Sequence, residues 1–224
     1  MRTALRNIVG KTYRPLLVKY LSKTRIYQQG DIRLEIPPQV FHPGFFFSTK
    51  MLLRYVNKLA LNRKKLLELG AGSGFISITA ARKGAIVTAT DINPVAIEYL
   101  HKNCDNNGVK VNIIQSDLFA SIPQQLFDII AINPPYYKKK PGSWQDHAWF
   151  CGENGEYFSG LFSQLRNYIH PNTEAIMILC EGCDIEMIRT IASQHGFDFR
   201  MMIKKQYLLE KNYIYKIDDR HDRP

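Results

Sequence analysis

The segment KLLELGAGSGFISITAARKGAIVTATD, residues 65–91, decides the fold of this chain. Residues 65–69 predict a short buried strand, and residues 75–84 carry apolar side chains at helical spacing up to a glycine. Residues 85–90 predict a second buried strand. A strand, a helix and a second strand in this order indicate two parallel strands joined by a crossover helix.

The rest of the chain continues this alternation. The apolar pattern predicts further helices at 51–61, 94–106 and 184–195, and further strands at 32–36, 111–116, 127–132, 175–180, 197–205 and 212–217. The last two strands lie close together in the sequence and can pair as an antiparallel edge. We therefore predict an α/β fold with a doubly wound, mostly parallel sheet and an antiparallel C-terminal edge strand.

Composition excludes several classes of protein. With 224 residues, 45% of them hydrophobic and 22% charged, the chain resembles an ordinary globular domain and not a disordered or fibrous protein. No apolar stretch reaches membrane-spanning length, so we expect no membrane span. Four cysteines are too few to cross-link a chain of this size, which favours a reducing compartment, the cytoplasm.

The positive charge is concentrated near the N-terminus. The net charge is +10, and residues 1–30 contain seven basic residues and no acidic one. We predict a basic N-terminal arm at 1–38, made of an amphipathic helix and a short strand, followed by one domain at 39–224. Three roles stay open for the arm: a helix packed on the domain, a contact with RNA or another substrate, or an organelle transit peptide.

Three strand ends predict a cofactor site, because ligands of open α/β sheets lie beyond the carboxyl ends of the strands. The glycine-rich loop after the first strand lets the backbone approach a ligand closely. Asp91 can accept both hydroxyls of a ribose, Asp117 can accept from an adenine amino group, and Leu118 can flank the ring. The predicted cofactor-binding residues are Glu68, Gly70, Ala71, Gly72, Ser73, Gly74, Asp91, Asp117, Leu118 and Asn133.

Two other nucleotide-binding patterns are excluded. Phe75 stands where a dinucleotide-binding loop has its third glycine, and no Gly-Lys-Ser/Thr ending of a phosphate-binding loop follows. The combination of glycine loop, Asp91 and Asp117 resembles the S-adenosylmethionine site of class I methyltransferases. That resemblance implies S-adenosylmethionine as the cofactor.

The fourth strand leads directly into Asn133, Pro134, Pro135 and Tyr136, which we predict to be the catalytic residues. Methylation of an amide or exocyclic amine requires a planar NH2 group held with its nitrogen facing the methyl donor. The side-chain oxygen of Asn133 and the carbonyl of Pro134 can accept two hydrogen bonds from such a group. The prolines stiffen the turn, and Tyr136 can stack on the planar group.

This tetrapeptide is similar to the motif of amino-N methyltransferases, which act on adenine N6, guanine N2 or the glutamine of release factors. The segment HAWFCGENGEYFSGLFSQL, residues 147–165, resembles the conserved segment of the HemK-type glutamine enzymes: Gly152 and Gly155 match, whereas Cys151 and Glu156 depart from it. The loop VFHPGFFFSTKMLL, residues 40–53, resembles that family's proline-containing loop. The resemblance covers about residues 38–217 and implies N-methylation of a macromolecule.

The acceptor remains open between a protein glutamine and an RNA base amine. The basic run Lys138–Lys140 and the aromatic residues Trp144, Trp149 and Phe150 suit a nucleic acid. A small-molecule acceptor and a non-catalytic RNA- or partner-binding module are the alternatives. Cys180 and Cys183 have no second ligand pair at metal spacing, so we expect no metal site.

Overall fold

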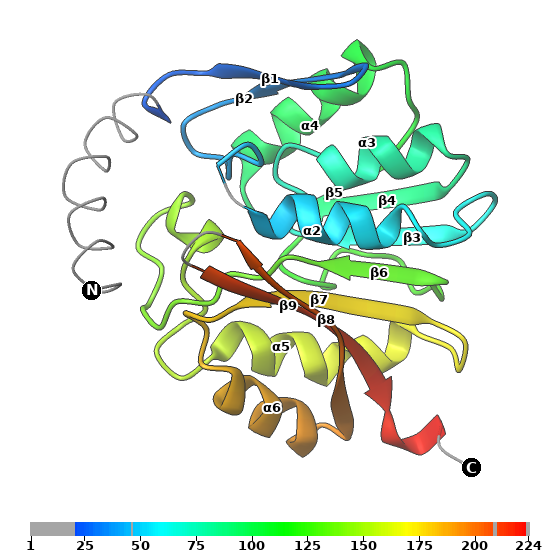
Figure 1. Ribbon diagram of the computed structural model, residues 1–224, viewed down its shortest axis with the longest axis vertical. Coiled ribbons are helices and arrows are strands. Elements are labelled where there is room, and N and C mark those ends of the chain that lie inside the picture. Colours follow the sequence, from blue (N-terminus) through cyan, green and yellow to red (C-terminus); the bar gives the residue numbers. More distant parts are fainter. Residues whose placement is uncertain (1–20, 46, 208–209, 223–224) are drawn as a thin grey trace.

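The computed structural model describes residues 21–45, 47–207 and 210–222. A seven-stranded sheet forms its centre, with the strand order β5-β4-β3-β6-β7-β9-β8 (Figure 1). The strands are β3 (Lys65–Leu69), β4 (Ile86–Asp91), β5 (Asn112–Gln115), β6 (Ile129–Ile132), β7 (Glu174–Cys180), β8 (Phe197–Tyr207) and β9 (Glu210–Asp219). From β5 to β7 the neighbouring strands pair in parallel, whereas β9 pairs antiparallel with both β7 and β8. The predicted mostly parallel sheet with an antiparallel C-terminal element is confirmed.

Helices cover both faces of the sheet, as predicted. One face carries α2 (Phe47–Val56), α3 (Phe75–Arg82) and α4 (Pro94–Asn106), and the other carries α5 (Glu156–Leu165) and α6 (Ile185–Gln194) (Figure 1). Alternate residues of each strand enter different cores: Leu66 packs with the first group of helices and Leu67 with the second. Short 3-10 helices complete the described part of the chain: η1 (Asp146–Ala148), η2 (Arg166–Tyr168) and η3 (Arg220–Asp222).

The order of the strands places a crevice between β3 and β6. The chain runs outward from β3 to β4 and β5, and then crosses back to place β6 and β7 on the other side. The loops after β3 and β6 therefore diverge at the carboxyl ends of two adjacent strands. In open α/β sheets this switch point is where ligands bind.

The helix predicted at 51–61 is shorter and begins earlier than expected. It spans Phe47–Val56, and the amides of Lys58 and Leu59 bond to carbonyls three residues back, which ends the helix in tight turns. Leu61 is nevertheless buried in the core, which explains the apolar periodicity beyond the helix.

The described part of the predicted arm forms a hairpin. The predicted strand is β2 (Ile32–Ile36), and it pairs with β1 (Arg25–Gln29), which the sequence pattern did not indicate. Two asparagines attach the hairpin to the domain. Asn103 of α4 exchanges two hydrogen bonds with the backbone of Glu35, at 2.7 and 3.0 Å, and Asn107, the residue that follows α4, bonds the backbone of Arg33. Most of the predicted arm helix lies outside the described residues, and the domain boundary after residue 38 stays a prediction.

Within the described ranges, no helix is both long enough and apolar enough to cross a membrane.

Candidate active site

A cleft opens at the crevice between β3 and β6. Its empty space, together with the open solvent at its mouth, is about 1110 Å³. The predicted residues that line it are Glu68, Gly70, Ala71, Gly72, Ser73, Asp91, Asp117, Leu118, Asn133, Pro134, Pro135 and Tyr136. Of the predicted site residues, Gly74 alone is not part of this lining.

The carboxylate of Asp91 is held by the loop after β3 and by the turn after β4. One carboxylate oxygen accepts from the amide of Gly72 at 2.9 Å, and the other accepts from the amide of Asn93 at 2.9 Å. Gly72 has a φ of 54°, in the left-handed region that favours glycine. Burial raises the pKa of Asp91, and the bonds from Asn93 and Gly72 oppose that rise. The carboxylate keeps lone pairs for the hydroxyls of a ribose.

Glu68 lies below the same loop and is buried. Its carboxyl accepts hydrogen bonds from both the amide and the hydroxyl of Ser77, in the first turn of α3. Burial raises the pKa of Glu68 to about 8. The side chain therefore joins the end of β3 to the start of α3 while it lines the floor of the cleft.

Gly74 has a packing role in this structure. It precedes α3 with a φ of 81°, and a Cβ atom built there would lie 2.1 Å from Cδ1 of Leu100 in α4. A glycine here permits the close approach of α3 to α4. A direct contact of Gly74 with the cofactor stays a prediction. The closeness of Gly74 to Leu100 supports an indirect role, in which Gly74 positions the loop through the packing of α3 on α4.

Leu118 has an unusual backbone. Its φ is 49°, which branched and bulky residues rarely adopt. Its side chain lines the cleft and packs above Gly160 of α5, where an added Cβ would lie 2.9 Å from Cδ1 of Leu118. Sparsely populated conformations of this kind concentrate at ligand sites. Together with Asp117, Leu118 forms the wall predicted to contact adenine.

The turn that we predict to be catalytic, residues 133–136, follows β6. The amide nitrogen of the Asn133 side chain donates to the hydroxyl of Thr49, at 3.3 Å, so the side-chain oxygen remains for an incoming N–H group. The carbonyl of Trp149 accepts from the amides of Tyr136 and Tyr137, at 3.2 and 2.9 Å, and so fixes the end of the turn. Burial raises the pKa of Tyr136, so its hydroxyl stays neutral.

Sequence reasoning missed several residues of the cleft. Phe41 and Thr49 line it from the aromatic loop and the start of α2, and His147 and Tyr157 line it from the segment 147–165. The aromatic run near residue 45 and the segment 147–165 were recognised, but no local pattern indicates which of their side chains face the crevice.

The aromatic and basic residues after the turn have mixed roles. Trp144 lines the cleft, whereas Trp149 packs against Phe41 with ring centroids 5.2 Å apart. Lys138 forms an ion pair with Asp184, and Lys139 lies over the ring of Phe150. Only part of the predicted aromatic and basic cluster therefore faces the cleft.

Cys180 ends β7 and Cys183 follows three residues later, and Cys180 lies close to Tyr136 of the predicted catalytic turn. The Sγ atoms of Cys180 and Cys183 are 3.6 Å apart, and both residues are free thiols. A hydrogen bond from Cys183 lowers the pKa of Cys180, and a smaller contribution comes from Tyr136. No cluster of three metal-ligating side chains exists among the residues that the structure describes.

The cleft fits S-adenosylmethionine by its donors and acceptors. A carboxylate fixed by backbone amides suits the ribose, an open glycine loop admits the methionine portion, and the Asp117–Leu118 wall suits adenine.

Comparison with known proteins agrees with this arrangement. A Methanocaldococcus jannaschii protein provisionally named a protein N5-glutamine methyltransferase is 33% identical over 64% of this chain and 74% of its own length. A Shewanella loihica tRNA1(Val) (adenine(37)-N6)-methyltransferase is 32% identical over 62% of this chain and 61% of its own length. The structure of a ribosomal protein L11 methylase from Lactobacillus delbrueckii has a TM-score of 0.61 at 20% identity and covers 84% of this chain and 85% of its own.

The fold and the cleft define a class I methyltransferase that uses S-adenosylmethionine. The model of the methyltransferase small domain family matches residues 33–148, and the chain belongs to that family. The predicted fold, family, cofactor and N-methyltransferase class are thereby confirmed. The roles of individual site residues remain predictions.

Proposed function

We propose that this chain transfers a methyl group to a planar NH2 nitrogen of a macromolecule, either a protein glutamine or an RNA base amine. The observation that carries the proposal is the position of Asn133 on the cleft wall. The amide nitrogen of Asn133 already donates to Thr49, so the side-chain oxygen of Asn133 can accept a hydrogen bond from the NH2 group. The carbonyl of Pro134 would accept the second hydrogen bond.

The chemistry then needs orientation more than acid–base groups. S-adenosylmethionine supplies an electrophilic methyl group on a sulfonium sulfur. Asn133 and Pro134 would hold the acceptor nitrogen facing this methyl group, so that a new carbon–nitrogen bond would replace the carbon–sulfur bond, and the surplus proton of the nitrogen would leave to water. The two hydrogen bonds that the NH2 group donates to these oxygens return lone-pair density to the nitrogen and stabilise the charge that develops there. Tyr136 would hold the planar group by stacking.

The other predicted residues would hold the cofactor. Asp91 would accept from the ribose hydroxyls, Asp117 and Leu118 would contact adenine, and the loop Gly70–Ser73 would face the methionine portion. Glu68 and Gly74 would keep this loop in place, through Ser77 and Leu100 respectively.

Both acceptor classes have support among the relatives. The M. jannaschii protein is named for protein glutamine, and the S. loihica protein acts on adenine 37 of a tRNA.

We also propose that the protein works in the cytoplasm, because its four cysteines are free, although Cys180 and Cys183 lie close together.

The test uses methyl-labelled S-adenosylmethionine and a cell extract depleted of this protein. Wild-type chain should transfer label to material that either RNase or protease destroys. Asn133→Ala should lower transfer by roughly 100-fold or more while cofactor affinity changes little, because Asn133 acts mainly on the acceptor. Asn172→Ala, an exposed asparagine far along the sequence from the site, is the matched control.

Three results would contradict the proposal. Transfer that survives Asn133→Ala would remove the assigned role of this residue. Label found only in small molecules would exclude a macromolecular acceptor, and cofactor binding without any transfer would favour a non-catalytic binding module.

A further inference from the structure

The chain turns sharply at the end of β7 and brings two cysteines together there. The amide of Cys183 donates to the carbonyl of Cys180 at 3.0 Å, so residues 180–183 form a β-turn. The amide of Cys180 in turn donates to Sγ of Cys183 at 3.1 Å, and the two Sγ atoms are 3.6 Å apart. The first and fourth Cα atoms of a β-turn lie within about 7 Å of each other, close to the roughly 4.4–6.8 Å that a disulfide spans. The backbone therefore already has the spacing that a disulfide needs.

Residues 180–184, which we call the β7 turn, pack against the predicted catalytic turn and the loop that follows it. Three successive residues of that loop each contact one residue of the β7 turn. The pairs are Tyr136 with Cys180, Tyr137 with Gly182, and Lys138 with Asp184. A change within the β7 turn therefore reaches the residues that follow Asn133 and the two prolines.

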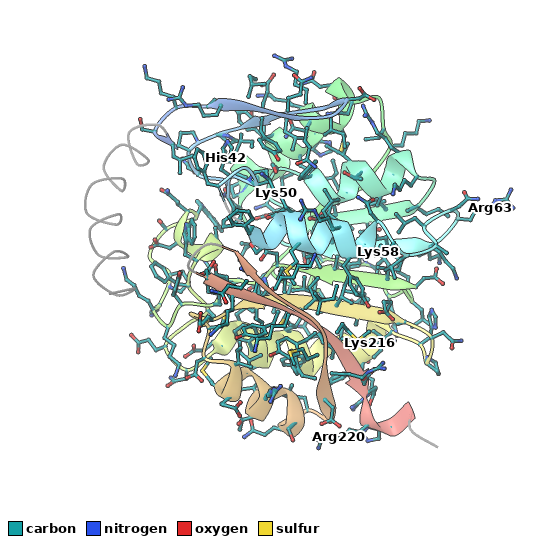
Figure 2. All side chains as sticks on the ribbon, viewed as in Figure 1. His42, Lys50, Lys58, Arg63, Lys216 and Arg220 are labelled. Atoms are coloured by element: carbon teal, nitrogen blue, oxygen red, sulfur yellow. The ribbon has the colours of Figure 1, made fainter. Side chains whose placement is uncertain are left out.

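The strand β9 holds the β7 turn from its other side. The amide of Glu181 donates to the carbonyl of Lys211 at 2.8 Å, and the side chains of these two residues form an ion pair at 2.7 Å. Lys216, which Figure 2 shows farther along β9, pairs with Glu174 of β7 at 2.7 Å. Because β9 is fixed at both places, a movement of the two sulfur atoms is passed to the side of the turn that faces Tyr136.

The two sulfurs have the features of a reactive dithiol. Cys183 is partly exposed, whereas Cys180 is buried. A hydrogen bond from Cys183 lowers the pKa of Cys180; burial opposes this effect, and the nearby Tyr136 supports it. A thiolate is the form that attacks a disulfide, so a lowered pKa favours exchange. Burial instead raises the pKa of both other cysteines, Cys104 and Cys151.

We infer that Cys180 and Cys183 form a site of reversible oxidation, at which a small disulfide such as oxidised glutathione joins the two sulfurs and slows methyl transfer. This inference rests on the proposed N-methyltransferase function and adds a means of regulating it. The site is not part of the cofactor pocket: among the described residues that line the cleft, Tyr136 is present but neither cysteine is.

The oxidation is a pair of thiol–disulfide exchange steps. Cys183 passes its proton to the thiolate of Cys180 and attacks one sulfur of the reagent, whose S–S bond breaks and releases one small thiolate. That thiolate takes the proton back from Cys180, which then attacks Sγ of Cys183 and releases the second small thiolate. One S–S bond is broken and one is formed, and the two electrons lost by the cysteines reduce the reagent.

The new bond changes the surroundings of Tyr136. The sulfurs must come together from 3.6 Å, and the sulfur of Cys180 loses the negative charge that makes it a good hydrogen-bond acceptor. Tyr136 then loses a contact that holds its ring for stacking. We expect the oxidised protein to transfer methyl groups roughly threefold to tenfold more slowly, the effect of one ordinary hydrogen bond, with little change in cofactor affinity.

The first measurement detects the disulfide itself. The full chain is incubated with oxidised glutathione, freed of reagent, alkylated and digested with trypsin. Both cysteines fall in the tryptic peptide 167–189, because no lysine or arginine lies between Arg166 and Arg189. This peptide should escape alkylation and be lighter by two hydrogen atoms, and dithiothreitol should reverse both changes.

The second measurement compares methyl transfer by reduced and oxidised protein, with methyl-labelled S-adenosylmethionine and a depleted cell extract that has been gel-filtered to remove small thiols. Cys183→Ser cannot form the disulfide and should keep its rate after treatment. The matched control is Cys151→Ser, at a buried cysteine whose Sγ donates to the carbonyl of Tyr137, a bond that a serine hydroxyl can replace. It retains the pair and should be slowed like wild type. Thermal unfolding checks that both variants are folded.

The inference is supported when the peptide carries the disulfide and dithiothreitol restores the rate of the treated wild type. A peptide that stays fully alkylated would overturn it. A disulfide that leaves the rate unchanged would overturn the link to methyl transfer, and an equal loss of rate in Cys183→Ser would assign the effect to another group.

The two measurements separate this inference from the proposed function. The peptide mass reports the disulfide without any methyl transfer. A failure of the proposed function would appear as absent transfer by the reduced protein although the disulfide forms, whereas a failure of the switch would appear as equal transfer by the reduced and oxidised proteins.

Discussion

The side-chain amide of Asn133 donates a hydrogen bond to the hydroxyl of Thr49, across 3.3 Å and 84 positions of sequence. Asn133 follows β6 and Thr49 lies in the first part of α2, so the bond joins the predicted catalytic turn to the helix, and both residues line the cleft. This contact decides which end of the Asn133 carboxamide faces the acceptor, because the carboxamide oxygen accepts hydrogen bonds whereas its nitrogen donates them.

We expect Thr49→Val to lower kcat by roughly threefold to tenfold, which corresponds to the loss of one ordinary hydrogen bond. Valine preserves the shape of threonine but leaves the amide nitrogen of Asn133 without its partner. Thr49→Ser keeps the hydroxyl and should retain most of the activity. The measurement is single-turnover transfer at saturating cofactor, and equal rates for the valine and serine variants would show that this hydrogen bond is not needed.

The alternation of strands and helices was predictable because each element carries its own pattern. Leu66 and Leu67 face opposite cores, so β3 appears in the sequence as a continuous apolar run. The strand β1 was missed because its residues, RIYQQ, show no apolar run: three of the five are arginine or glutamine, and even Ile26 is exposed. It forms because β2 supplies its hydrogen bonds and Gly30, with a φ of 58°, permits the tight connection.

The candidate site was predictable where strand ends define it. Asp91 ends the strand β4 and Asn133 directly follows β6, and the order of strands brings them to one edge of the sheet. Thr49 and Tyr157 reach the same cleft only through the packing of α2 and α5, which no local spacing shows. The packing role of Gly74 likewise depends on the distance to Leu100, which the sequence does not contain.

We expect Asp91→Asn to weaken binding of S-adenosylmethionine by roughly ten- to hundredfold, the effect of losing a hydrogen bond to a charged group. The asparagine can offer one acceptor oxygen, but its amide nitrogen would face either a backbone N–H or the ribose hydroxyls. Isothermal titration calorimetry measures the change. Asp105→Asn, at an exposed position of α4, is the matched control, and equal affinities of the two variants would remove Asp91 from the ribose site.

Gly74→Ala should destabilise the fold by about 2–5 kcal/mol, since it combines a strained left-handed alanine with overpacking against Leu100. Gly108→Ala is a close control, because Gly108 also has a positive φ, of 62°, but a Cβ there meets no atom within 4 Å. Gly108→Ala should lower the free energy of unfolding by about 1–2 kcal/mol, because it carries the conformational strain without the overpacking. Urea unfolding measures both, and equal costs would show that α3 and α4 can separate without penalty.

The raised pKa of Glu68 predicts a specific dependence of stability on pH. Burial raises this pKa to about 8, above the ordinary value of 4.5. Between about pH 4.5 and pH 8, the folded protein therefore keeps a proton that the unfolded chain has already released. The stabilisation from this bound proton is fully present below about pH 4.5 and is lost as the pH rises through about 8. The nearby charge of Asp91 acts in the same direction, whereas the two bonds from Ser77 act against it.

Glu68→Gln should remove this dependence, because glutamine has the shape of the protonated acid and its oxygen can accept both bonds from Ser77. In urea unfolding of the cofactor-free protein, we expect the variant to match wild type near about pH 5 and to be more stable than wild type above about pH 8. Glu98→Gln, at an exposed glutamate of α4, should follow the wild-type curve closely. Parallel curves for wild type and Glu68→Gln over the whole range would show that the Glu68 carboxyl ionises in the folded protein as it does in the unfolded chain.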